Sequence, residues 1–125
     1  LVVDDSEHIR ELFLITLKKL GIKSIDQAND GSYLLSKFKD SIEKGHGYDL
    51  ILLDYHMPNM DGPEGLKKVR EYEDQCGRER CKVIAITTDD QKNSILNMLE
   101  SGADTYLIKP FLKQDAEKLL FDTFL

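Results

Sequence analysis

Three aspartates stand at the ends of short apolar runs, where they could form one acidic site. Asp4 and Asp5 follow residues 1–3, and Asp54 follows four consecutive aliphatic residues at 50–53. Carboxylates held within a few ångströms of one another repel unless a cation is present or one of them is protonated. Hard oxygen ligands of this kind suit Mg²⁺, with Mn²⁺ as the alternative ion. The three residues therefore indicate a divalent-metal site.

A hydroxyl and an ammonium group follow two later apolar runs. Thr87 comes after residues 83–86, and Lys109 comes after residues 105–108. Together with a metal ion, such groups stabilise the oxygens of a transferring phosphoryl group, because this reaction is catalysed mainly by positioning and electrostatics. An aspartate can accept that group and form a labile anhydride. Asp54 is therefore the residue around which we expect the chemistry to be arranged.

The apolar runs have the length and composition of buried strands. Residues 50–53 are too few for a helix and do not alternate with polar residues, as in a strand of a parallel sheet covered on both faces. Similar strands are expected at 1–3, 82–86 and 105–108, with a more polar edge strand at 22–28. Apolar residues at helical spacing fill the intervals and predict helices between Ser6 and Gly21, at about 32–44, at 64–73, from 87–90 to Gly102, and at about 113–124.

Strands and helices that alternate five times predict a doubly wound α/β fold. The connections are long enough for helical crossovers, which join parallel strands. Because the carboxyl ends of parallel strands lie at one edge of a sheet, the five polar residues named above are expected to converge at that edge.

Composition limits the classes of function. A chain of 125 residues suits one domain with its own core. The net charge of −6, without a Lys/Arg-rich run, argues against nucleic-acid binding, and no apolar stretch approaches the ~20 residues of a membrane span. Cys76 and Cys81 match no metal or redox motif, so we expect free thiols and a cytoplasmic protein. Because the chain opens in a strand at Leu1, without Met, we expect it to be truncated at its N-terminus and part of a longer product.

Further motifs accompany the strand-end residues along the whole chain. They are Asp4-Asp5, Asp54 with Met57-Pro58 and Asp61-Gly62, Thr87 after Val-Ile-Ala-Ile, Gly102-Ala103-Asp104, Tyr106, and Lys109-Pro110-Phe111. In this order and at these spacings, the set resembles the receiver domain of two-component response regulators. The resemblance implies a single receiver domain over residues 1–125, with a flavodoxin-like sheet of strand order 2-1-3-4-5.

The resemblance also implies a role for each acidic residue. Asp54 would accept a phosphoryl group from the phosphohistidine of a histidine kinase or a histidine phosphotransfer protein. Asp5 and Asp54 would bind Mg²⁺ directly together with the backbone carbonyl of His56, and Asp4 would bind it through water. The domain would catalyse its own phosphorylation and dephosphorylation without being an enzyme by itself; a fused histidine kinase core would change that.

The remaining implied features concern the response to phosphorylation. Thr87 and Lys109 would bind the phosphoryl oxygens, and Tyr106 would swing inward when Thr87 moves. The Lys109–Pro110 peptide bond would be cis. Downstream effectors would bind the face made by the fourth helix, the fifth strand and the fifth helix, which are expected at 87–102, 105–108 and 113–124.

Two positions depart from the usual pattern, and two other functions compete with the first. Thr88 stands where the family usually has Ala or Gly, and His56 lies near the path of an attacking water, so both bear on the lifetime of the phosphorylated form. A degenerate receiver would be a phosphorylation-independent interaction module, but the acidic, Thr and Lys positions are all kept. A phosphatase of the haloacid-dehalogenase type would need a second Asp where His56 stands.

Asp61, before Gly62-Pro63, is expected to cap a helix.

Overall fold

The computed structural model of the protein contains one parallel sheet. It describes residues 1–55, 57, 62–88 and 92–124. Five strands are hydrogen-bonded in the order β2-β1-β3-β4-β5. They are β1 (Val2–Val3), β2 (Gln27–Ala28), β3 (Leu50–Asp54), β4 (Lys82–Thr87) and β5 (Thr105–Ile108). The predicted doubly wound sheet and its strand order are confirmed.

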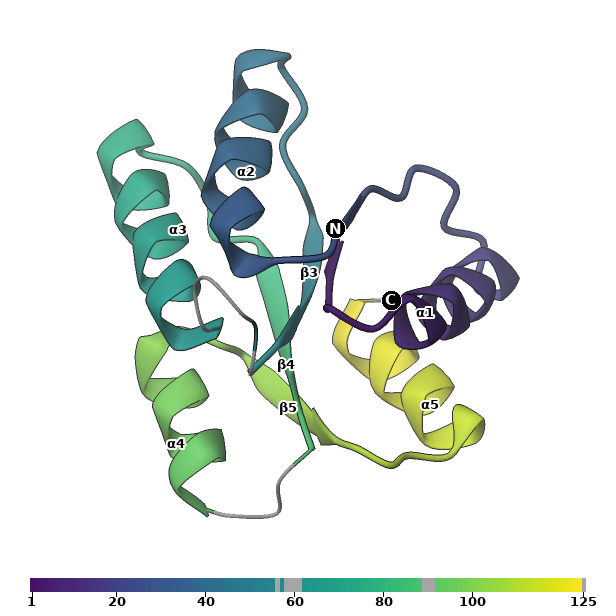
Figure 1. Cartoon of the computed structure of the whole chain (residues 1–125). Helices are drawn as coiled ribbons and strands as arrows, with labels where there is room; N and C mark the ends of the chain where they lie inside the picture. The colour runs from purple at the N-terminus through teal and green to yellow at the C-terminus, as the bar shows by residue number, and fades with distance from the viewer. Residues whose placement is uncertain (56, 58–61, 89–91, 125) are drawn as a thin grey trace.

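Helices cover both faces of this sheet. They are α1 (Glu7–Lys19), a 3₁₀ turn η1 (Gly31–Tyr33) that leads into α2 (Leu34–Glu43), α3 (Gly62–Cys76), α4 (Lys92–Ser101) and α5 (Lys113–Phe124). Helices α2, α3 and α4 lie on one side of the sheet, and α1 and α5 lie on the other (Figure 1). Within the described residues, no helix is long and apolar enough to cross a membrane.

The two faces of β3 explain why its sequence is continuously apolar. Ile51 and Leu53 pack into the cluster under α2, α3 and α4, whereas Leu50 and Leu52 pack into the cluster under α1 and α5. All four side chains are buried. Successive residues of a strand point to opposite faces, so a strand covered on both sides needs apolar residues at every position. The prediction of a doubly covered central strand is confirmed.

Several element boundaries differ from the predicted ones. The strand predicted at 22–28 is wrong for residues 22–26, because β1 offers only Val2 and Val3 as partners and the ladder ends with them. The second helix begins as the turn η1, with the side chain of Asp30 accepting a hydrogen bond from the Ser32 N–H. The fourth helix was expected to start within 87–90; Thr87 belongs to β4, residues 89–91 lie outside the described part, and α4 is described from Lys92.

The third helix is longer than predicted at both ends. It runs from Gly62 to Cys76 instead of from 64 to 73, so the loop expected from Asp74 onwards begins later. The polar residues at 74–80 suggested a solvent-exposed loop, but the first three of them continue the helix. Within the helix, Arg70 and Glu73 are buried, and Arg70 donates to the backbone carbonyls of Cys81 and Gly102.

Candidate functional site

An acidic cluster forms where the first and third strands end. Val3 of β1 is paired with Leu53 of β3, so the residues that follow them, Asp4 and Asp54, are neighbours across the sheet. Asp4, Asp5 and Asp54 each place a carboxylate oxygen within 4.8 Å of the other two. Asp4 and Asp54 are buried, whereas Asp5 is exposed. The convergence predicted from the parallel topology is present.

Lys109 brings a positive charge to this cluster from the end of β5. Its Nζ lies 2.8 Å from Asp4 Oδ2 and 3.6 Å from Asp54 Oδ1. The backbone N–H of Lys109 donates to the carbonyl of Thr87, and the following peptide bond to Pro110 is cis, as the resemblance implied. The lysine therefore bridges two carboxylates from inside the site and is not a solvated surface ion pair.

The environment of Asp54 opposes its negative charge. Burial raises the pKa of its carboxyl group from 3.8 to about 7, and the nearby charge of Asp4 adds to the rise. Lys109 acts in the opposite direction, and Asp5 contributes a smaller upward effect on this pKa. Burial and like charge both disfavour ionisation. A bound divalent cation would remove this penalty by neutralising the carboxylates.

The donor set fits a hard divalent cation. The three side chains supply only carboxylate oxygens, which are the ligands that Mg²⁺ and Mn²⁺ take in proteins. Two of the three carboxylates are buried, and the ammonium group of Lys109 carries a single positive charge between them, so negative charge remains for a metal to offset. The predicted carbonyl ligand, His56, and the predicted helix cap, Asp61, lie outside the described residues.

The loop that carries Asp4 is fixed by two donors, one of which was missed from the sequence. Ser6 caps α1 by accepting the Ile9 N–H with its side chain, and its own N–H donates to Asp4 Oδ1 at 2.9 Å. Arg10 Nη1 donates to the carbonyl of Asp4 at 2.8 Å, and its Nε donates to Gln27 Oε1 at 3.2 Å. Arg10 stands four residues after the cap, one helical turn on, and this spacing is the signal that could have identified it.

Thr87 and Tyr106 lie on neighbouring strands but in different environments. Thr87 ends β4 at the same edge as Asp54 and is buried. Its strand partner is Ile108, and Tyr106 lies two residues earlier on β5. The side chain of Tyr106 is 41% exposed. The structure thus brings Thr87 to the site edge and places Tyr106 on the outer surface beside it.

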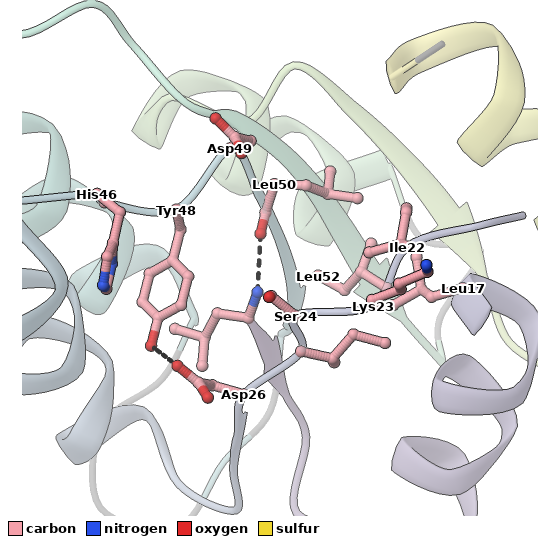
Figure 2. A pocket seen from close by; sticks show the side chains of 13 residues that line it. Leu17, Ile22, Lys23, Ser24, Asp26, His46, Tyr48, Asp49, Leu50 and Leu52 are labelled. Carbon is pink, nitrogen blue, oxygen red and sulfur yellow. Dashed lines mark hydrogen bonds between the residues drawn. The ribbon is translucent and has the colours of Figure 1, made fainter.

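A cavity at the other end of the strands lies away from this chemistry. It has a volume of about 730 Å³ and is lined by residues such as Leu1, Ile22 and Tyr48. The Tyr48 hydroxyl donates to Asp26 Oδ2 at 2.6 Å, and the bond is drawn as a dashed line in Figure 2. Burial together with this bond raises the pKa of Tyr48. Leu50, which starts β3, lines the cavity, whereas Asp54 ends that strand. The cavity therefore lies at the opposite edge of the sheet, and we assign the site by its charged groups, not by its size.

A second charged cluster, with Arg70 and Glu73 buried and Asp104 exposed, ties α3 to the starts of β4 and β5. Arg70 donates to the carbonyls of Cys81 and Gly102 and pairs with Glu73 at 2.8 Å and Asp104 at 3.3 Å. Glu73 in turn accepts the Cys81 N–H, and Asp104 accepts the Val83 N–H. All these groups have partners within the cluster, which indicates a structural role.

The cysteines are free as predicted, with Cys76 exposed and Cys81 buried.

Known proteins resemble this chain over nearly its whole length. A family model described as the response regulator receiver domain matches residues 1–121. A chemotaxis protein CheY homolog from Campylobacter jejuni subsp. jejuni is 33% identical over 125 residues, which cover 98% of this chain and 88% of that protein. A chain of the CheX-CheY-BeF3-Mg+2 complex from Borrelia burgdorferi has a TM-score of 0.85 and 26% identity, covering 99% of this chain and 87% of that one. The Vibrio cholerae chemotaxis protein CheY4 has a TM-score of 0.79 and 30% identity, and the alignment covers 98% of this chain and 94% of that one.

Proposed function

The chain belongs to the response regulator receiver domain family, and on this premise we propose that it is a phosphorylation switch whose acceptor is Asp54. The observation that supports this most is the arrangement at the strand ends: the buried Asp54 faces two further aspartates on one side and the ammonium group of Lys109 on another. A phosphodonor with a phosphohistidine, either a histidine kinase or a histidine phosphotransfer protein, is the proposed source of the group.

Asp5 and Asp54 are the proposed direct ligands of Mg²⁺, with Asp4 acting through water and His56 through its backbone carbonyl. When bound, the ion neutralises the carboxylates and the charge on the transferring oxygens. The all-oxygen donor set and the raised pKa of Asp54 support this assignment. The similar structure from Borrelia burgdorferi is a CheX-CheY-BeF3-Mg+2 complex, which supports the proposal that this chain also binds Mg²⁺.

The proposed reaction forms one bond to phosphorus and breaks another. A carboxylate oxygen of Asp54 attacks the phosphorus of the phosphohistidine, the phosphorus–nitrogen bond breaks, and the neutral imidazole leaves on the donor. The product is an acyl phosphate on Asp54, which water later hydrolyses to inorganic phosphate and the free carboxylate. Lys109 and Thr87 would hold the phosphoryl oxygens, since transfer depends mainly on positioning and charge stabilisation.

Phosphorylation would then shift the domain between two arrangements. Thr87 would move toward the phosphoryl group, and Tyr106 would turn inward from its exposed position. The proposed output surface is the face of α4, β5 and α5, and each of these elements carries an exposed apolar or aromatic residue: Leu96, Tyr106 and Phe121. Ligand binding at one site can change a distant surface only through differential stabilisation of the two arrangements.

Incubation with Mg²⁺ and acetyl phosphate, followed by intact mass measurement, tests this function. We expect a gain of one phosphoryl group that is absent with a chelator and in Asp54→Ala. Asp49→Ala, at the exposed start of the same strand region, is the matched control and should be phosphorylated normally. A folded chain that gains no mass would contradict the proposal and favour an interaction module, and turnover of a generic phosphate ester would favour a phosphatase.

A further inference from the structure

Tyr55 connects the strand that carries Asp54 to helix α4. Its backbone N–H donates to the carbonyl of Ile86 at 2.8 Å, which fixes the residue at the end of β3. Its hydroxyl oxygen accepts a hydrogen bond from Nδ2 of Asn97 on α4 at 3.2 Å. The ring packs against the core cluster on the side of α2, α3 and α4. The residue next to Asp54 therefore reaches a polar side chain of α4.

The neighbouring residue of α4 contacts the same region by packing. Met98 is fully buried beside Gly62, which starts α3. A Cβ added at Gly62 would lie 2.5 Å from the carbonyl oxygen of Asp54 and 3.0 Å from Cε of Met98. Gly62 is thus held between the backbone of Asp54 and α4, and there is no room for a side chain at this position. A movement of the Asp54 backbone would therefore displace Gly62 and change its packing against Met98.

The surface between α3 and α4 leaves room for such a movement. A groove of about 350 Å³ lies there, lined by Tyr55 together with Glu64 and Lys67 of α3 and Asn97 and Glu100 of α4. Its walls are mostly polar and are not sealed by apolar packing. Specific contacts such as the one between Tyr55 and Asn97 therefore matter for the position of α4 at this groove.

We propose that Tyr55 and Asn97 form a latch that holds α4 in the unphosphorylated position, and that phosphorylation at Asp54 opens it. The inference rests on the proposed function and adds a route to α4 separate from Thr87 and Tyr106. Under the proposed function, the pairing of Lys109 with Asp4 and the exposed side chain of Tyr106 would belong to the unphosphorylated arrangement. Tyr55 is a positioning residue in this scheme: it acts on α4 and does not touch the phosphoryl group.

The latch is tested by measuring the binding affinity of beryllofluoride, an analogue of the phosphoryl group, in the presence of Mg²⁺. Coupling between two sites is reciprocal, so a contact that favours the unphosphorylated position weakens beryllofluoride binding. We expect Tyr55→Phe and Asn97→Ala each to tighten binding by roughly two- to fivefold, the range of one partly exposed hydrogen bond. The double variant should bind no more tightly than either single variant, because both remove the same bond.

Matched controls separate a latch from a general loosening of the fold. Tyr33→Phe removes a hydroxyl from another exposed tyrosine, and Asn93→Ala shortens an exposed asparagine of the same helix. Both controls should bind beryllofluoride with the wild-type affinity. Wild-type affinity in Tyr55→Phe and Asn97→Ala, or additive effects in the double variant, would overturn the latch alone. A wild-type chain that fails to bind beryllofluoride would instead overturn the proposed function, and the latch with it.

Discussion

The ammonium nitrogen of Lys109 lies 2.8 Å from Oδ2 of Asp4 and joins the end of the last strand to the end of the first. The two side chains are only 12% and 1% exposed. Removing one partner of a buried ion pair leaves the other charge uncompensated, which costs far more than the loss of a surface pair. Because the same ammonium group also faces Asp54, one cation partly offsets two carboxylates.

Lys109→Met should separate metal binding from phosphoryl transfer. The substitution removes a positive charge that repels Mg²⁺, so the affinity for Mg²⁺ should rise several-fold. It also removes a group that would stabilise the phosphoryl oxygens, so the rate of phosphorylation by acetyl phosphate should fall by roughly 10²-fold. Metal titration and time-resolved intact mass would measure the two effects.

Lys113→Met is the control for that variant, because Lys113 is exposed at the start of α5. It should leave both Mg²⁺ affinity and the phosphorylation rate unchanged. If Lys109→Met were phosphorylated at the wild-type rate, the assignment of Lys109 to the phosphoryl oxygens would be wrong.

The raised pKa of Asp54 predicts how stability depends on pH in the metal-free protein. Its carboxyl pKa is about 7 in the folded chain against an ordinary value of 3.8, so the folded state binds this proton more tightly than the unfolded state does. The contribution of Asp54 therefore favours folding at low pH and is lost as pH rises from about 4 to about 7. Asp54→Asn should raise the free energy of unfolding at about pH 8 by on the order of 2 kcal/mol.

Urea unfolding with a chelator at about pH 5 and about pH 8 would measure this effect. The gain in stability from Asp54→Asn should be larger at the higher pH, where the wild-type carboxyl is ionised. Asp122→Asn, at an exposed position of α5, should change stability little at either pH. An equal gain from Asp54→Asn at both pH values would contradict the raised pKa.

The same pKa predicts competition between protons and Mg²⁺. A carboxylate must lose its proton before it binds the ion, so the apparent affinity should weaken by up to about tenfold for each pH unit below about 7. Above that pH the affinity should level off. Calorimetric titrations across this range would measure the slope, and Asp54→Asn should bind more weakly with a flatter dependence. A wild-type affinity that is constant from about pH 5 to about pH 8 would exclude Asp54 as the competing group.

Much of the fold was predictable because a strand that is buried on both faces has apolar residues at every position of its sequence. The run 50–53 is apolar at every position, and the structure shows each of its side chains buried. The gathering of Asp4, Asp5 and Asp54 followed from the parallel topology alone, since consecutive strand ends share one edge. The extent of β2 could not be predicted in this way, because its length depends on the two-residue partner β1.

Contacts between distant elements left no signal that the sequence could show. The role of Arg70 depends on the position of the α4–β5 turn, because its guanidinium group donates to the carbonyl of Gly102 there. The bond between Tyr55 and Asn97 depends on where α4 packs against β3. The inward swing of Tyr106 stays a prediction, and the carbonyl of His56 lies outside the described residues.

Arg70→Met should destabilise the protein without changing its chemistry. The substitution would leave Glu73 buried without its cationic partner and Asp104 without its pair, which should lower the free energy of unfolding by roughly 3–5 kcal/mol. Arg78→Met, at an exposed position of the next loop, is the control and should have little effect. Denaturant unfolding measures both. A loss under about 1 kcal/mol would show that the Arg70 cluster is not a buried ion pair in solution.

Borohydride reduction of the phosphorylated protein, followed by peptide mass analysis, tests the central proposal most directly. The reagent reduces an acyl phosphate to an alcohol and so converts the phosphorylated aspartate into homoserine. After treatment with acetyl phosphate and Mg²⁺, we expect homoserine at position 54 and an unchanged aspartate at positions 4, 5 and 49. Homoserine at any of those other positions, or at none, would contradict the assignment of Asp54 as the acceptor.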